Sequence, residues 1–321
     1  MKAAVHYETG PPEVLRYEDV PDPTPGPGEV LVEVEAISIE GGDTLNRLGG
    51  EMVTTPHVVG YQCAGTVRAV GDAVTDRAPG DRVVCTSTHG SHAELIAVPA
   101  LLTWPIPDGL DVLEAATVPV PWGTADDCLF ELGRLEPGET VLIQAAAGGV
   151  GIAAIQLAHR AGATVLAVVG GAERGARLRD LDLGCDHVLD HRAVDVAVAA
   201  RDLTGGRGVD LVVDPVGSTL PTSLATLAHR GRCLLVGQAG RDPRPIDASL
   251  LMAGNQSLTG VFLGAEIATP RVRDVIARHL DDVAAGRSRV VIDRVFPLAE
   301  AAEAHAYVES RAAVGRVVMV P

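Results

Sequence analysis

The chain has 321 residues, which is enough for two domains with cores of their own. Its formal net charge of −16 argues against a nucleic acid or an anionic membrane surface as a partner, because both are negatively charged. The five cysteines are odd in number and form no C-x-x-C pair, and no secretion signal precedes them, so we expect a reduced, cytoplasmic protein.

Both ends of the chain show the pattern of a β-rich domain. Residues 29–36 alternate charged and apolar side chains after a proline-rich connector at 21–28. Further short strands are expected at 58–70 and 80–85, and short strands return after residue 289 around an amphipathic helix at 298–310. We therefore predict one β-rich domain built from residues 1–120 and 265–321.

The middle of the chain, residues 121–264, alternates apolar runs with helical stretches. Strands are expected at 141–143, 164–169, 187–190, 208–214, 231–237 and 257–263, and helices at 152–157, 172–182 and 194–203. Such alternation predicts a parallel sheet covered by helices on both faces. The uncharged segment 141–158 approaches the length of a membrane span, but its glycines favour a strand, a turn and a helix.

The turn after the first of these strands has the spacing of a dinucleotide-binding fingerprint. Ala146, Gly148 and Gly151 occupy the three positions of G-x-G-x-x-G, with alanine in the first. Small residues are needed there because a pyrophosphate must approach the backbone at the start of the next helix. The predicted contacts are Ala147, Gly148, Gly149, Val150 and Gly151.

Several segments, in the same order, resemble the medium-chain dehydrogenase/reductase superfamily, and in particular its zinc-independent quinone oxidoreductase (zeta-crystallin-like) branch. They are PEVL at 12–15, GPGEVLV at 26–32, GYQCAG at 60–65, PGDRV at 79–83, the glycine turn within 137–151 and FPLAEAAEAH at 296–305. The resemblance implies an α/β fold in which a doubly wound Rossmann domain is inserted in a GroES-like β-barrel catalytic domain. It also implies a homodimer formed partly through the last Rossmann strand.

The zinc site of the metal-dependent relatives has no counterpart in this pattern. Those relatives carry a cysteine in the segment matching 39–43 and a histidine-glutamate pair after the glycine matching Gly60, whereas this chain has Glu40, Tyr61 and Gln62. One oxygen ligand cannot build a tetrahedral nitrogen and sulfur site, so we expect no catalytic metal. Cys85, His89 and His92 have ligand-like spacing, but a solvated loop is the simpler interpretation.

Without a Lewis acid, reduction of an activated acceptor is easier than oxidation of an alcohol. In a quinone or an α,β-unsaturated carbonyl compound (an enone), conjugation carries the incoming electrons onto oxygen, where hydrogen bonds stabilise the charge. We therefore expect a reductase of such a small molecule. The alternatives are a biosynthetic enoyl reductase with a tailored substrate, a cofactor-binding protein with little activity and a zinc-type alcohol dehydrogenase.

The second Rossmann strand ends in Gly170 and Gly171, without the acid that bonds the ribose of NAD. By resemblance, Arg174 and His191 lie at the 2′-phosphate of NADPH, with Arg177 as a helper and Arg311 or Arg316 approaching from the tail. NADPH is therefore the expected cofactor. The other predicted cofactor residues lie at strand ends or match cofactor contacts of the relatives. They are Gly170, Thr124, Val216, Gly217, Gly237, Gln238, Ala239, Phe262 and Leu263.

The substrate pocket is where the chain departs most from its relatives. Glu40 replaces a common asparagine and Leu45 a common tyrosine. Glu40 and Tyr61 are the candidate catalytic residues, and Leu45 and Trp122 are candidate pocket residues. Glu40 could act as an acid if burial raised its pKa, or it could orient a polar acceptor. The alternative is that Glu40 is a solvent-exposed glutamate in a loop.

Overall fold

The computed structural model describes residues 1–242 and 244–321. It divides into two compact units, one formed by Met1–Val120 with Glu266–Pro321 and the other by Pro121–Ala265. Among the described residues, no helix combines the length and the apolar character that crossing a bilayer would require.

The second unit contains a six-stranded sheet whose strands are all parallel. Its strands are β9 (Thr140–Ile143), β10 (Thr164–Val169), β11 (His187–Asp190), β12 (Val209–Asp214), β13 (Leu227–Leu235) and β14 (Ser257–Gly260). The order β11-β10-β9-β12-β13-β14 reverses direction between β9 and β12, as in a doubly wound dinucleotide-binding sheet. The predicted α/β fold with a parallel Rossmann sheet is therefore confirmed.

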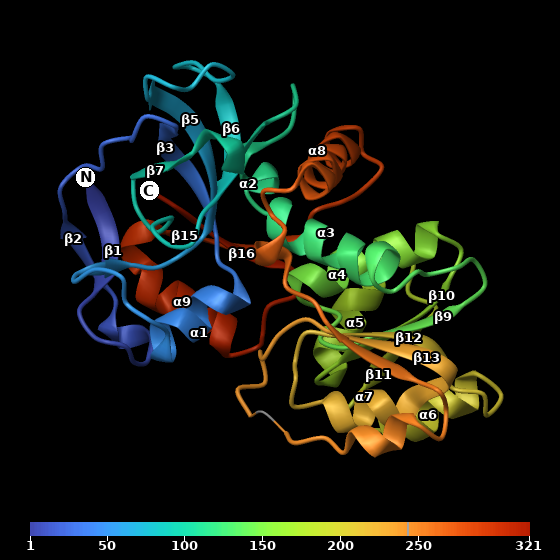
Figure 1. The fold of residues 1–321 in the computed structure, drawn as a ribbon. Coiled ribbons are helices and arrows are strands. Elements are labelled where there is room, and N and C mark those ends of the chain that lie inside the picture. The colour runs from blue at the N-terminus through green and yellow to red at the C-terminus, as the bar shows by residue number, and fades with distance from the viewer. Residues whose placement is uncertain (243) are drawn as a thin grey trace. The chain divides into compact units, whose positions relative to one another are not determined.

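Helices cover both faces of this sheet (Figure 1). They are α4 (Gly149–Arg160), α5 (Ala172–Asp180), α6 (Val196–Leu203) and α7 (Leu220–Thr226), while α3 (Pro119–Asp126) begins at the boundary of the unit. Helices α4 and α5 lie on one face, and α6 packs beside α7 on the other. The central strands β9, β10 and β12 can therefore be almost wholly apolar.

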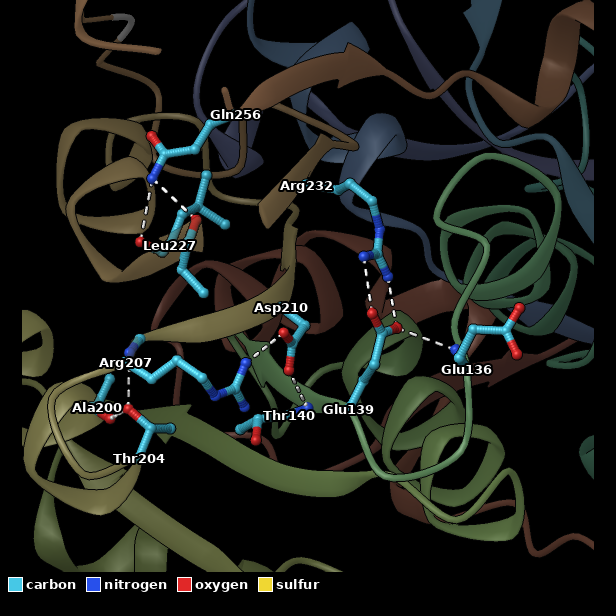
Figure 2. Close-up of polar contacts among 12 residues, drawn as sticks. Glu136, Glu139, Thr140, Ala200, Thr204, Arg207, Asp210, Leu227, Arg232 and Gln256 are labelled. Atoms are coloured by element: carbon cyan, nitrogen blue, oxygen red, sulfur yellow. Dashed lines mark hydrogen bonds and ion pairs between the residues drawn. The ribbon is translucent and has the colours of Figure 1, made fainter. Parts of the chain in front are cut away.

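Polar side chains fix the register of the strands at the amino edge of the sheet (Figure 2). Arg232 of β13 forms a two-pronged ion pair with Glu139, which precedes β9, at 2.9 and 2.6 Å. Asp210 of β12 accepts from the Thr140 backbone N–H at 2.8 Å and pairs with Arg207. These contacts lie at the edge opposite to the glycine turn, so we assign them to stability.

The first unit contains two sheets. A three-stranded antiparallel sheet has the order β2-β1-β4, and a seven-stranded sheet follows the path β15-β16-β3-β5-β6-β8 with β7 beside β3. The strands are β1 (Lys2–His6), β2 (Arg16–Asp19), β3 (Glu29–Ser38), β4 (His57–Val58), β5 (Gln62–Val70), β6 (Arg82–Thr86), β7 (Leu95–Pro99), β8 (Thr103–Pro105), β15 (Ile292–Pro297) and β16 (Arg316–Val320). Its helices are α1 (Gly41–Gly49), α2 (Val112–Ala115), α8 (Pro270–Ala284) and α9 (Ala301–Glu309).

Strand β3 shows why this unit folds as a β-rich body. Val30, Val32 and Val34 are buried and alternate with more exposed side chains, as expected for a strand with one face on the core. The run expected at 58–70 is instead divided, because Gly60 adopts φ +96° and turns the chain between β4 and β5. An ideal Cβ at Gly60 would lie 2.0 Å from Nδ1 of His92, so only glycine fits this turn.

A buried polar network connects α1 and α9. The guanidinium of Arg47 is fully buried; its Nε donates to Gly10 O at 3.1 Å, and its Nη2 pairs with Glu309. Its Nη1 donates to His305 Nδ1 at 3.1 Å, so a neutral His305 carries its proton on Nε2 and donates to His92 Nε2 at 2.9 Å. Burial lowers the pKa of His92 to about 3 and that of His305 well below its ordinary value. Both rings are therefore neutral near pH 7.

Candidate cofactor and catalytic sites

The turn between β9 and α4 has the shape that a bound pyrophosphate requires. Gly148 is the N-cap of α4, and the backbone N–H groups of the first turn point out of the helix end. An ideal Cβ at Gly151 would lie 2.6 Å from Cα of Ala146, so the third position of the fingerprint accepts only glycine. The side chain of Ala147 is buried, whereas Gly149 and Val150 are partly exposed at the helix start. These residues fit a dinucleotide cofactor.

The loop after β12 is organised by a residue that the sequence analysis missed. Asp214 is fully buried, and its Oδ1 accepts hydrogen bonds from the backbone N–H groups of Val216 at 2.9 Å and Gly217 at 3.0 Å. Thr219 and Ser223 donate their hydroxyls to the same carboxylate. The signal was present in the sequence, since an acid at the end of an apolar strand is poorly suited to a core.

The loops after β12 and β13 pack closely against each other at the carboxyl edge of the sheet. The backbone N–H of Ala239 donates to Pro215 O at 3.2 Å. An ideal Cβ at Gly217 would lie 2.8 Å from Oε1 of Gln238 and 2.9 Å from O of Gly237. The predicted strand-end residues therefore lie together, at the edge where open α/β sheets bind ligands.

Other predicted residues of the second unit differ in their exposure. Trp122 and Thr124 are both buried in α3. After β14, Leu263 is buried, whereas the side chain of Phe262 is 79% exposed. At the other end of the sheet, Arg174 lies partly buried in the first turn of α5, and His191 is exposed just after β11.

In the first unit, Glu40 is the centre of a buried polar cluster at the start of α1. Its side chain is 4% exposed, so the alternative of a solvent-exposed glutamate is wrong. Oε1 of Glu40 accepts from Ser38 Oγ at 3.0 Å and from Gln62 Nε2 at 3.1 Å, and it pairs with Nη2 of Arg316. Arg316 Nη2 also donates to Ile39 O at 2.7 Å.

These contacts bear on one prediction about the cofactor. By resemblance, Arg311 or Arg316 was expected to approach the adenosine phosphate from the tail, and the guanidinium of Arg316 is engaged by Glu40 and Ser38 within the first unit. Strand pairing explains this, because β16 lies beside β3, at whose end Ser38 stands. We therefore assign Arg316 to the Glu40 cluster. Arg311, the other tail arginine, is exposed after α9.

Three acidic groups in this cluster have raised pKa values. Burial raises the pKa of the Glu40 carboxyl, and Arg316 and Ser38 oppose that rise. Burial also raises the pKa of Asp43 well above its ordinary value, although its Oδ2 accepts a hydrogen bond from the Glu40 backbone N–H at 2.8 Å. Burial and the two carboxyl groups raise the pKa of Tyr61 as well. In all three groups, burial thus opposes the charged form.

Tyr61 packs against helix α1, and Leu45 is part of it. An ideal Cβ at Gly42 would lie 2.4 Å from the hydroxyl oxygen of Tyr61, so the ring stands directly over the first turn of the helix. Leu45 is partly buried on the same helix. The structure therefore brings Glu40, Tyr61 and Leu45 into one region of the first unit.

The donor set around Glu40 does not suit a zinc ion. The guanidinium of Arg316 pairs with the Glu40 carboxylate. The side-chain amide of Gln62 donates to Ala116 O at 2.7 Å and accepts from the Val120 N–H at 2.6 Å. Within residues 1–242 and 244–321, no group of three His, Cys, Asp or Glu side chains is arranged to hold a metal.

The loop that carries Cys85, His89 and His92 was interpreted above as solvated, and for two of these residues that is wrong. The Cys85 side chain is buried, with its Sγ 3.2 Å from Sγ of Cys63 across β5 and β6. The His92 ring is buried against His305. Cys85 and His92 therefore have separate partners.

Comparison with known proteins finds family models that match segments in both the N-terminal and the C-terminal half of the chain. Residues 26–108 match the family model of the alcohol dehydrogenase GroES-like domain, and residues 183–319 match that of a zinc-binding dehydrogenase. A 2-haloacrylate reductase from Burkholderia sp is 34% identical over 99% of this chain and 98% of its own length. Two solved structures, each covered completely and covering the whole chain, are also similar. They are an Escherichia coli quinone oxidoreductase complexed with NADPH (29% identity, TM-score 0.94) and a mycobacterial protein complexed with NADPH (39% identity, TM-score 0.93).

Proposed function

The chain belongs to the quinone oxidoreductase branch of the medium-chain dehydrogenase/reductase family, and on this premise we propose that it is an NADPH-dependent reductase of quinones and enones. The observation that carries the proposal is the glycine turn of the second unit, where Gly151 packs against Ala146 and opens the start of α4 to a pyrophosphate. Relatives that match the chain over its whole length have been solved with NADPH.

The reaction needs a hydride and a proton for each acceptor molecule. Bound NADPH would supply the hydride, and the acceptor would carry the resulting negative charge on its conjugated oxygen. One proton then completes the reduction, to a saturated carbonyl compound from an enone or, after tautomerisation of the ring, to a hydroquinone from a quinone. The protein's task is to orient the acceptor, to stabilise that charge and to deliver the proton.

The Glu40 cluster has the chemistry for the last two tasks. Burial raises the pKa of both Glu40 and Tyr61, and groups of this kind can act as general acids. Arg316 places a positive charge against the same carboxylate. We assign proton delivery or acceptor orientation to Glu40 and Tyr61, and pocket shape to Leu45 and Trp122. No metal is assigned, because Arg316 and Gln62 occupy the carboxylate that would have to bind it.

Two measurements test this function. Purified protein is titrated with NADPH and NADH, and NADPH oxidation is then followed with a panel of quinones, enones and enoyl thioesters. We expect NADPH to bind more tightly than NADH and at least one quinone or enone to be reduced. Binding without turnover on any acceptor would instead support a cofactor-binding protein, and binding of neither cofactor would overturn the proposal.

The proposal extends to assembly and compartment. We propose a homodimer that forms along β14, which has a neighbouring strand on one side only among the described residues. Apolar side chains in the segments that precede and follow β14 are exposed: Leu250 by 64%, Met252 by 77% and Phe262 by 79%. We also place the protein in the reducing cytoplasm, which suits the buried thiols of Cys63 and Cys85.

A further inference from the structure

The ends of β10 and β11 are joined by one carboxylate. These strands pair in parallel, with Val169 opposite Asp190. Oδ1 of Asp190 accepts from the backbone N–H of Gly171 at 2.8 Å and from that of Arg192 at 2.9 Å. The Asp190 carboxylate therefore binds two backbone N–H groups, and these hydrogen bonds hold the chain after β11 beside the end of β10.

Two cationic or basic side chains consequently lie over the glycines that end β10. An ideal Cβ at Gly170 would lie 2.7 Å from His191 Nε2 and 3.3 Å from Arg192 Nε. An ideal Cβ at Gly171, which has φ +98°, would lie 3.5 Å from Arg192 Nη1. The imidazole and the guanidinium thus fill the space that a side chain at 170 would occupy.

Side chains at the end of the second Rossmann strand determine whether a protein of this fold prefers NADH or NADPH. A protein that binds NAD usually ends its second strand with an acid, which accepts a hydrogen bond from the ribose 2′-hydroxyl. Here that strand ends in Gly170, and Arg192 presents its guanidinium at the same place. A guanidinium suits a phosphate because it is always charged and can donate two parallel hydrogen bonds.

We propose that Arg192 binds the 2′-phosphate of NADPH and is a principal determinant of the preference for NADPH over NADH. This assignment rests on the proposed function and adds a residue to it, since Arg174 and His191 were predicted from the resemblance and Arg192 was not. Its side chain is exposed after β11. In a chain with a net charge of −16, this local positive charge also favours the approach of an anion.

The test is equilibrium binding without an acceptor, so that it does not depend on turnover. NADPH and NADH are titrated into the wild type, Arg192→Ala, Arg192→Lys and the control Arg179→Ala. Arg179 is exposed in the last turn of α5, so the control removes an equal charge from the same region. We expect Arg192→Ala to weaken NADPH binding by ~10–100-fold, as for loss of a charge-assisted contact, and to change NADH binding less than about threefold. Arg192→Lys should recover part of the loss, and Arg179→Ala should match the wild type.

A competition experiment identifies the phosphate as the group recognised. Adenosine 2′,5′-bisphosphate should compete with NADPH much better in the wild type than in Arg192→Ala, whereas 5′-AMP should compete equally in both. Unchanged NADPH binding in Arg192→Ala, or equal losses for NADPH and NADH, would overturn the role of Arg192 while leaving the reductase proposal intact. Failure of the wild type to bind either cofactor would overturn both.

Discussion

The buried pair His92 and His305 should make the first unit sensitive to acid. Burial holds the pKa of both rings far below the ordinary histidine value, to about 3 for His92. In the unfolded chain each ring would take up a proton as the pH falls through about 6.5, but in the folded chain it would not. The unfolded state therefore binds more protons in this interval, and the stability that is present above about pH 6.5 is lost as the pH falls toward about 3.

The size of the effect follows from that difference. About 1.5 pH units below the ordinary pKa, a ring that stays neutral only in the folded chain, such as that of His92, costs about 2 kcal/mol, and His305 adds a loss in the same direction. A typical domain has roughly 5–15 kcal/mol of stability in all. Glu40 and Asp43 act in the opposite direction, because their pKa values are raised in the folded state and protonation stabilises it. The clean test is therefore a difference between variants.

The assay uses the two tryptophans, of which Trp104 lies in the first unit and Trp122 in the second. In a Trp122→Phe background, Trp104 fluorescence reports the unfolding of the first unit by urea. We expect the loss of stability between about pH 7.5 and about pH 5 to be smaller in His92→Gln than in its parent by about 2 kcal/mol.

The control for the substitution itself is His229→Gln, at an exposed position of the second unit, measured in the same way. His92→Gln will lower stability at both pH values, because it removes a hydrogen-bond partner of His305, and that common loss cancels in the comparison. An identical pH dependence in His92→Gln and its parent would refute the reasoning.

Three further predictions concern the proposed function. Glu40→Gln should lower turnover of an enone by ~10²-fold, with little change in NADPH affinity, whereas a reactive quinone should be reduced almost as fast; equal rates on every acceptor would leave Glu40 without a role. Gly151→Ala should destabilise the glycine turn by about 1–3 kcal/mol and weaken NADPH binding in a titration, because its methyl group would meet Ala146; wild-type affinity would contradict that packing. Phe262→Asp should halve the mass measured by light scattering if the protein dimerises along β14, and an unchanged mass would argue against that edge as the interface.

The sequence identified the second unit well because its signals are local. The strands expected at 164–169 and 187–190 have the bounds of β10 and β11, since each is a short apolar run whose end is marked by a glycine or a charged residue. The start of β13 was placed at 231 but lies at Leu227. His229 and Arg230, two exposed polar residues, interrupt the apolar pattern there.

The polar clusters could not be derived in the same way, because their members are far apart in the chain. Glu40 and Arg316 meet through the pairing of β3 with β16, and Arg47 meets His305 through the packing of α1 and α9. No periodicity encodes either contact. Arg192 was overlooked for a different reason: its role depends on the glycine that ends the neighbouring strand.

The central claim, a metal-independent NADPH-dependent reductase, is tested most directly by turnover after chelation. Protein dialysed against a strong chelator and analysed for bound zinc is supplied with NADPH and with the quinone or enone that it reduces best. We predict less than stoichiometric zinc, the same rate before and after dialysis, and no increase when zinc is added back. A rate that disappears on chelation and returns with zinc would contradict the account, because the Glu40 cluster would then have to exchange Arg316 for a metal ion.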